Sequence, residues 1–280
     1  GERAELGFFV EQGERPKWGW LDVEADWDFP TALPRFDRVN DPDYYVEIVN
    51  RGRAPLSYAL SPKQDWIKLS QREGTILFDE KITVTIDWTK APAGSSTGEI
   101  VISGGGSEYT VTVPIRNEQP AVAGWVENGG VVAIEAAQFD HASTAPDAHW
   151  IAVPNLGRTG SSVTIAPAQA ARRASVDGAP SLEYDFTLLD AATVAVNAYV
   201  SPTLDFRKGD GLKFALAIDD APPRIVNINE GEEVPDWKYP DWWNNAVGDH
   251  IKIKRSEHQA LAPGKHTLKV WMVDSGIVLQ

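Results

Sequence analysis

The feature that most constrains the fold is a succession of short segments in which apolar and polar residues alternate. In the clearest of them, Ile82, Val84, Ile86 and Trp88 fall on one face. A period of two is that of a β-strand with one buried face. Similar segments lie at 44–49, 56–60, 75–78, 99–102 and 109–115. Six or seven short strands within about 75 residues predict an immunoglobulin-like β-sandwich.

A second set of strand-like segments follows residues 117–120, where the alternation is lost. These segments are 131–136, 162–165, 182–186, 194–200, 212–218, 224–228, 251–254 and 266–272. Eight strands with long loops predict a β-jelly-roll, and the one helix-like stretch, 166–174, is expected to be a loop or a single turn. The chain is therefore predicted to be all-β, with four parts. They are an N-terminal wrapping segment (1–35), an immunoglobulin-like β-sandwich (36–118), a linker (119–130) and a jelly-roll domain (131–280).

Charge and hydropathy exclude two classes of partner. The chain has 40 acidic and 26 basic residues, for a formal net charge of −14. Such a surface repels phosphate backbones, and Arg172-Arg173 is too short a basic cluster to compensate, so we expect no nucleic-acid partner. No run of apolar residues is long enough to cross a bilayer, so we expect no membrane partner.

The chain contains 11 tryptophans. The flat face of an indole stacks on the apolar face of a pyranose ring, so exposed tryptophans are typical of sugar-binding surfaces. Burial in a β-sandwich core is the alternative role for any one of them. A cluster of aromatic residues in an irregular segment favours the first role.

Such a cluster occurs at 236–245, where Pro235 and Pro240 interrupt any regular pattern. A loop buries few large rings, so some of these aromatic side chains are expected to be exposed or to line a groove. The alternative is a loop that folds back and caps the mouth of the sandwich. The candidate sugar-binding residues in this segment are Trp237, Tyr239, Trp242, Trp243 and Asn244.

A second candidate segment, 149–162, contains Trp150 and Arg158. Gly157 and Gly160 indicate tight turns that would hold Arg158 outward. Its guanidinium could bind a uronate carboxylate in a bidentate manner, or it could form an intramolecular salt bridge. We expect the aromatic segment 236–245 to face Trp150 and Arg158 across one binding site.

Catalytic residues are not expected in this chain. It has five histidines and no Gly-x-Ser-x-Gly motif, and no spacing typical of a transition-metal site or an EF-hand. The acidic pairs Asp219-Asp220, Glu232-Glu233 and Asp236/Asp241 are of a kind that 40 acidic residues produce by chance. An enzyme acting on glycosidic bonds remains a third and less favoured hypothesis.

Several spaced segments resemble the C-terminal domain of glycoside hydrolase family 115, the xylan α-1,2-glucuronidases. They are 132–139, Trp150 with 156–160, 263–270 and 273–280. The segments 33–37, 45–52, 66–70 and 84–88 are similar to the β-sandwich that precedes that domain, and 11–13 resembles the segment after the family's helical domain. The resemblance covers essentially the whole chain.

The resemblance implies an accessory role, because the family's catalytic barrel lies N-terminal to the matched segments. It implies a non-catalytic region similar to carbohydrate-binding modules of families 6 and 35, with xylan or glucuronoxylan as the plant polysaccharide and the catalytic domain as a partner. Those modules often hold a structural calcium ion, and the matching residues here are Glu135 and Asp274. This chain has Glu-Ala-Ala where the modules commonly have Glu-Ala-Glu.

Two further expectations concern assembly and location. Instead of binding glycans, the β-domains could dock on the catalytic domain or form a homodimer, with the tryptophan-rich segment at the interface. The chain has no cysteine, which fits an exported bacterial protein and also many cytosolic ones. Together with a polysaccharide ligand, this predicts a secreted or periplasmic bacterial protein.

Overall fold

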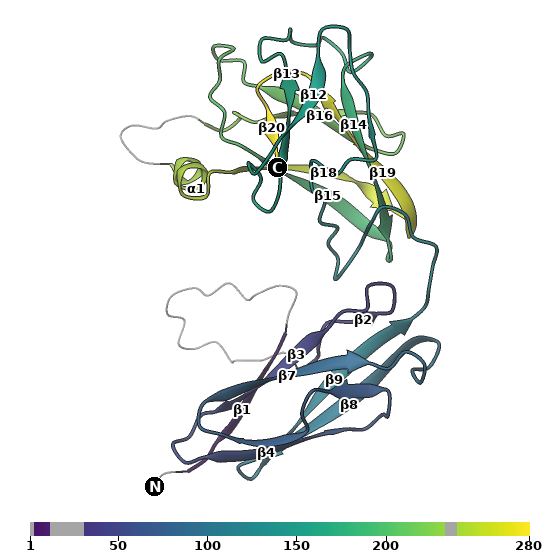
Figure 1. Cartoon of the computed structure of the whole chain (residues 1–280), viewed down its shortest axis with the longest axis vertical. Helices are drawn as coiled ribbons and strands as arrows, with labels where there is room; N and C mark the ends of the chain where they lie inside the picture. The colour runs from purple at the N-terminus through teal and green to yellow at the C-terminus, as the bar shows by residue number, and fades with distance from the viewer. Residues whose placement is uncertain (1–2, 12–30, 233–239) are drawn as a thin grey trace. The chain divides into compact units, whose positions relative to one another are not determined.

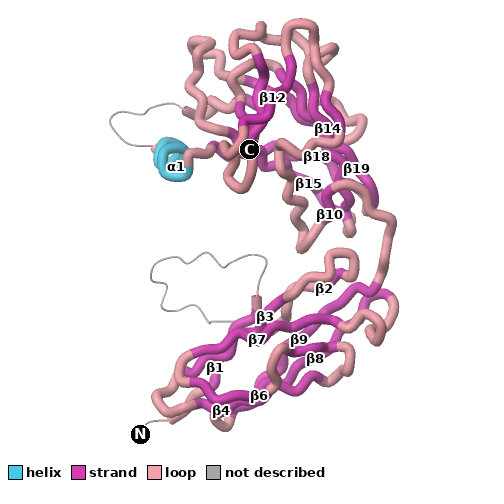
Figure 2. Tube along the Cα trace, in the orientation of Figure 1, coloured by secondary structure: helices cyan, strands magenta, loops and turns pink. Residues whose placement is uncertain are grey.

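The computed structural model describes residues 3–11, 31–232 and 240–280. The chain forms two compact units, Gly1–Pro120 and Ala121–Gln280, called here the first and second sandwich (Figure 1). Strands dominate both units (Figure 2). Within the described ranges, no helix is both long and apolar enough to cross a membrane.

The first sandwich consists of two sheets. One has the order β1 (Leu6–Val10), β3 (Tyr44–Asn50), β7 (Asp79–Ile86), β5 (Ile67–Leu69). The other has the order β2 (Phe36–Asp37), β9 (Ser107–Asn117), β8 (Gly94–Gly104), β4 (Leu56–Pro62), β6 (Glu73–Ile76). Neighbouring strands are antiparallel except β2 and β9, which are parallel.

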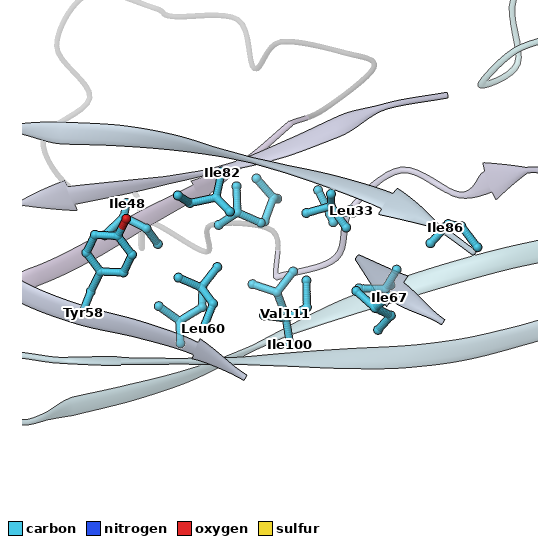
Figure 3. Packing of buried hydrophobic residues seen from close by; sticks show 14 of the residues in the cluster. Leu33, Ile48, Tyr58, Leu60, Ile67, Ile82, Ile86, Ile100 and Val111 are labelled. Atoms are coloured by element: carbon cyan, nitrogen blue, oxygen red, sulfur yellow. The ribbon is translucent and has the colours of Figure 1, made fainter. Parts of the chain in front are cut away.

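The alternating pattern explains the core of the first sandwich. Ile82, Val84 and Ile86 all point inward from β7 and are buried, as their spacing predicts. They meet side chains of the opposite sheet, among them Leu60 and Ile100, in one apolar layer (Figure 3). Each such side chain contributes about 1.5–3 kcal/mol of transfer free energy when it leaves water.

The second sandwich also has two sheets. The six-stranded sheet has the order β10 (Trp125–Val126), β14 (Ser181–Leu188), β19 (Gly264–Met272), β16 (Lys213–Ile218), β17 (Arg224–Asn227), and β11 (His141–Ala142) also pairs with β14. The five-stranded sheet has the order β12 (His149–Val153), β13 (Ser162–Ala166), β20 (Val278–Leu279), β15 (Ala192–Val200), β18 (Lys252–Leu261). From β13 to β20 the chain passes repeatedly between the sheets, as in a jelly roll. The predicted all-β fold is confirmed.

Two predicted elements differ from the structure. Residues 131–136 form no strand; their backbone makes one isolated bridge, Asn128 with Val131, around the positive-φ residues Gly129 and Gly130. The aromatic segment, predicted to be a loop, contains the helix α1 (Asp241–Asp249). Pro240 precedes its first residue, where the missing N–H costs no intrahelical bond.

Part of the expected linker 119–130 belongs to the second sandwich. Trp125 and Val126 form β10, which pairs in parallel with β14. The Thr187 hydroxyl donates to the carbonyl of Ala123 and accepts from its N–H, at 2.8 and 2.9 Å. Within the expected wrapping segment 1–35, β1 is a regular strand of the first sandwich, paired with β3 over five residues.

Candidate functional site

The structure places part of the predicted aromatic cluster on a surface helix. Trp237 and Tyr239 lie outside the described residues, whereas Trp242, Trp243 and Asn244 lie in α1. The Trp243 side chain is 38% exposed, Trp242 is half-buried and Asn244 is exposed. The helix leads directly into β18, which forms one edge of the five-stranded sheet.

Trp150 does not share a site with this helix. It lies on β12, at the other edge of the same sheet, with β13, β20 and β15 between the two edge strands. Four interstrand spacings of about 4.8 Å separate edges by about 19 Å. The Trp150 ring packs against two buried apolar clusters, and its buried indole N–H has no hydrogen-bond partner in the part of the chain that the structure describes. Of the segment expected to face Trp150, the described part, α1, thus adjoins the opposite edge of the sheet, and sheet order is not visible in local sequence.

Arg158 lies in the hairpin between β12 and β13 and is exposed. The hairpin is closed by a 2.9 Å hydrogen bond from the N–H of Gly157 to the carbonyl of Gly160. The Thr159 hydroxyl donates to the carboxylate of Glu135. Among described residues Arg158 forms no ion pair, so the structure contains no intramolecular salt bridge of the kind considered for it.

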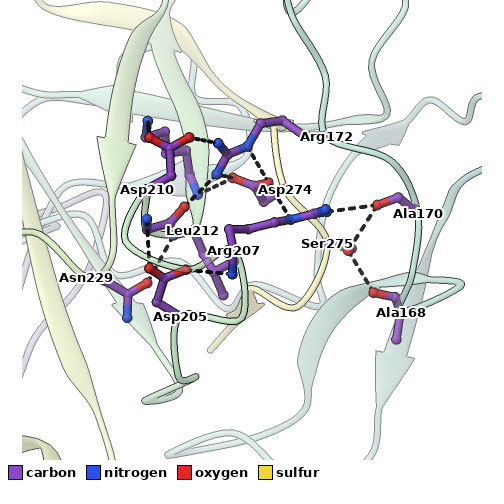
Figure 4. A network of polar contacts seen from close by, with 12 residues as sticks. Ala168, Ala170, Arg172, Asp205, Arg207, Asp210, Leu212, Asn229, Asp274 and Ser275 are labelled. Carbon is purple, nitrogen blue, oxygen red and sulfur yellow. Dashed lines mark hydrogen bonds and ion pairs between the residues drawn. The ribbon is translucent and has the colours of Figure 1, made fainter.

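Asp274 is held by arginines. Its buried carboxylate accepts hydrogen bonds from Arg172 Nε at 2.7 Å and Arg172 Nη2 at 2.9 Å, and from the backbone N–H of Lys213 at 2.9 Å (Figure 4). Arg207 Nε lies 3.3 Å from the same carboxylate. Two guanidinium groups thus occupy the position where a cation would bind.

Glu135 and Asp274 do not fit a shared calcium ion. Glu135 contacts the hairpin before β13, whereas Asp274 contacts Arg172, which follows β13. A five-residue strand spans about 17 Å, far more than the separation of two ligands of one ion. Across the described ranges, no group of three or more histidine, aspartate and glutamate side chains could hold a metal.

A different tryptophan occupies a position suited to ligand binding. In β19, Leu268, Val270 and Met272 point inward, so Trp271 points to the solvent side of the six-stranded sheet. It is half-buried and belongs to none of the apolar clusters of the second sandwich. Its ring therefore has a sheet beneath it and solvent access above.

The residues around Trp271 come from three adjacent strands. Ser181 on β14 and Ala215 on β16 pair directly with it, and Lys269 pairs with Glu183 one step along the sheet. Lys213 lies two residues before Ala215, on the same face. We call this surface the Trp271 face: Trp271, Ser181, Glu183, Lys213 and Lys269; Ala215 itself is fully buried.

Charged groups of the Trp271 face are paired loosely. Lys269 Nζ lies 3.8 Å from Glu183 and Lys213 Nζ lies 3.8 Å from Asp210, and both lysine side chains are partly exposed. The Ser181 hydroxyl lies 2.8 Å from that of Ser143. The face therefore presents an aromatic ring bordered by hydroxyl, ammonium and carboxylate groups.

Sequence reasoning did not single out Trp271, although the signal was present. The segment 266–272 was predicted to be a strand, and its alternation puts Trp271 on the same face as Thr267 and Lys269. A tryptophan in register with polar residues indicates the solvent side of a sheet.

The jelly-roll sandwich corresponds to a known protein domain. Residues 124–280 match the family model described as the glycosyl hydrolase family 115 C-terminal domain. The chain belongs to glycosyl hydrolase family 115. Comparison with curated proteins found no match.

Similar solved structures include a family 115 4-O-methyl-α-glucuronidase with specificity for decorated arabinogalactans. It shares 19% identity with a TM-score of 0.36, over 55% of this chain and 19% of that one, so this chain spans about a fifth of that enzyme. An isomalto-dextranase of Arthrobacter globiformis T6 shares 11% identity with a TM-score of 0.30, over 89% of this chain and 35% of that one.

Proposed function

We propose that this chain is a non-catalytic, polysaccharide-binding region of a family 115 enzyme that acts on xylan or glucuronoxylan. The observation that carries the proposal is the outward position of Trp271 on the six-stranded sheet. The catalytic domain would precede this region in the enzyme. Such an enzyme would be secreted or periplasmic and bacterial, where plant polysaccharides are met.

The chemistry of the Trp271 face suits a sugar chain. An indole offers a flat apolar area at a low cost in conformational entropy, because only two side-chain torsions need to be fixed. Ser181, Glu183 and Lys269 offer donors and acceptors for hydroxyl groups at the edge of a stacked ring. A few polar groups around an apolar surface are typical of ligand sites.

Affinity electrophoresis on gels containing xylan or glucuronoxylan tests this proposal. The wild-type chain is expected to be retarded, and Trp271→Ala is expected to lose the retardation while remaining folded by circular dichroism. Trp243→Ala on α1 is the matched control, because it removes another partly exposed indole of the same domain and should leave retardation unchanged. If neither polysaccharide retards the wild type, the proposal is wrong; loss with Trp243→Ala alone would move the site to α1.

A second candidate is an architectural or dimerisation role. It is favoured by exposed apolar side chains on neighbouring elements, Trp243 and Val247 on α1 and Ile253 on β18. Exposed apolar groups gathered on one surface are typical of protein contacts. This role predicts self-association in light scattering that Val247→Ser together with Ile253→Ser abolishes, and no retardation by any glycan.

A further inference from the structure

The loop between β15 and β16 presents two exposed apolar side chains at its tip. Leu204 is 85% exposed and Phe206 is 48% exposed. Scattered exposed apolar residues are ordinary on protein surfaces, but a pair at one loop tip is of interest when the loop is rigid.

Asp205, between the two, fixes the loop from within. Its carboxylate accepts backbone N–H groups of Arg207 at 2.8 Å, Gly209 at 2.7 Å and Gly211 at 3.1 Å. Desolvation acts to raise the pKa of Asp205, but these three bonds outweigh it and lower that pKa. The carboxylate is therefore ionised and bonded at neutral pH.

Contacts with the rest of the sandwich hold the loop from outside. Arg207 Nη2 donates to the carbonyl of Ala170 at 3.2 Å, and Asn229 Nδ2 donates to the carbonyl of Thr203 at 3.1 Å. A Cβ atom on Gly276 would lie 2.6 Å from the Phe206 ring, so that ring packs directly on the Gly276 backbone. The contacts of Asp205, Arg207 and Asn229 (Figure 4) thus hold Leu204 and Phe206 in one arrangement.

The partner of such a surface is a protein rather than a sugar. The polar atoms of Asp205, Arg207 and the neighbouring Arg172 form hydrogen bonds within the protein. Few groups therefore remain to bind the hydroxyls of a sugar. Rigid apolar anchors are typical of the energetic centres of protein interfaces, because little entropy is lost when they bind.

The small size of the surface favours a partner on the same polypeptide. Two side chains expose on the order of 200 Å², whereas a stable interface between separate proteins needs about 800 Å² from each partner. Tethering supplies an effective concentration of about a millimolar, so a much smaller contact suffices within one chain. Residues 124–280 match a C-terminal domain, so the hydrolase part of a family 115 enzyme lies on its N-terminal side.

We propose that Leu204 and Phe206 anchor the second sandwich in an apolar depression on the hydrolase part of its own enzyme. This inference rests on family membership and not on polysaccharide binding. The Trp271 face is a separate surface, so a single enzyme could use both at once.

Hydroxyl-radical footprinting of this chain alone and within the full-length enzyme tests the proposal. Oxidation of Leu204 and Phe206 is expected to fall several-fold in the full-length enzyme, whereas Ile225, which is exposed on β17, is oxidised equally in both. In the full-length enzyme, Leu204→Ser should make residues 121–280 more accessible to limited proteolysis. In this chain alone the same change should leave the melting temperature unaltered, because Leu204 is 85% exposed.

Several outcomes would overturn the proposal. Equal oxidation of Leu204 and Phe206 in both proteins shows that nothing covers the tip. Protection in this chain alone that grows with its concentration indicates a second copy as the occupant. Protection of Phe206 by added xylan, instead of by the hydrolase part, indicates a sugar. Absence of xylan binding leaves this inference intact and contradicts only the proposed function.

Discussion

Asp274 joins two other loops of the second sandwich, the loop after β13 and the loop between β15 and β16, through its two carboxylate oxygens. Arg172 follows β13, Arg207 follows β15, and the Lys213 N–H begins β16, so one buried charge joins segments far apart in sequence. The network stabilises the second sandwich only when all its partners are present, because a buried carboxylate without its cation carries a large desolvation penalty.

Replacing Arg172 therefore tests this network. We expect Arg172→Met to lower the free energy of unfolding of the second sandwich by about 3 kcal/mol. The control is Arg173→Met, whose partner Asp147 is exposed, with an expected loss of about 1 kcal/mol or less. Urea unfolding followed by tryptophan fluorescence measures both. Equal losses would show that burial of Asp274 is not the cause.

The buried imidazole of His258 predicts a pH dependence of stability. It is 5% exposed, and burial, followed by the nearby Arg224 charge, lowers its pKa. The folded protein thus binds this proton less tightly than the unfolded chain. The stabilisation by neutral His258 is complete above the unfolded pKa of about 6.5 and is lost as the pH falls below it.

The matching variant is His258→Leu. Its free energy of unfolding should fall less between pH 7.5 and pH 5 than that of the wild type, as measured by urea unfolding at each pH. The pH dependence that His266 contributes has the opposite sign. Burial opposes protonation of His266, but Asp219 and the Ala262 carbonyl outweigh burial and raise its pKa. Its contribution is present below about pH 6.5 and is lost as the pH rises through the folded pKa. If the free energy of unfolding falls equally between pH 7.5 and pH 5 in the wild type and in His258→Leu, the prediction for His258 is contradicted.

Among the elements, β10 depends on one glycine. Gly124 has a φ of 63°, and a Cβ atom there would lie 1.8 Å from the Asp185 carbonyl oxygen of β14. The backbone approaches β14 this closely because the side chain is absent.

Gly124→Ala should therefore detach β10 from β14. Gly129→Ala is the matched control, since Gly129 has a φ of 60° but no atom within 4 Å of a Cβ. The free energy of unfolding of the control should fall by about 1 kcal/mol from left-handed backbone strain alone. That of Gly124→Ala should fall by clearly more. Hydrogen exchange of the Glu127 amide, which donates to the Thr187 carbonyl, reports the detachment directly. Equal losses of stability would rule out the steric cause.

The alternation of apolar and polar residues predicted most strands correctly. It failed for a segment that has no strand to pair with and for the segment that forms a helix. Residues 131–136 are apolar enough for a strand but have no strand partner beyond one bridge. The helix α1 has tryptophan and asparagine pairs in place of a clear apolar stripe, so its sequence resembles a loop. The separation of Trp150 from α1 follows from sheet order, which depends on contacts distant in sequence.

For the whole molecule, a net charge of −14 would hinder the approach of an anionic polysaccharide such as glucuronoxylan, one of the ligands that we propose. Long-range attraction is absent, although repulsion is screened beyond about 8 Å at physiological salt. Recognition of such a ligand would then depend on short-range contacts, such as an indole face and the lysines beside it. This favours a site like the Trp271 face over a diffuse charged surface.

The two sandwiches have separate cores, so we expect two unfolding transitions. Ile48 belongs to the buried cluster of the first sandwich and Leu182 to that of the second, and both are fully buried. Ile48→Ala should lower the first sandwich's transition and Leu182→Ala the second's, each by about 3 kcal/mol, with the other transition unchanged. Differential scanning calorimetry measures both transitions, and limited proteolysis identifies which sandwich melts. A single transition shifted by both variants would show instead that the two cores unfold as one cooperative unit.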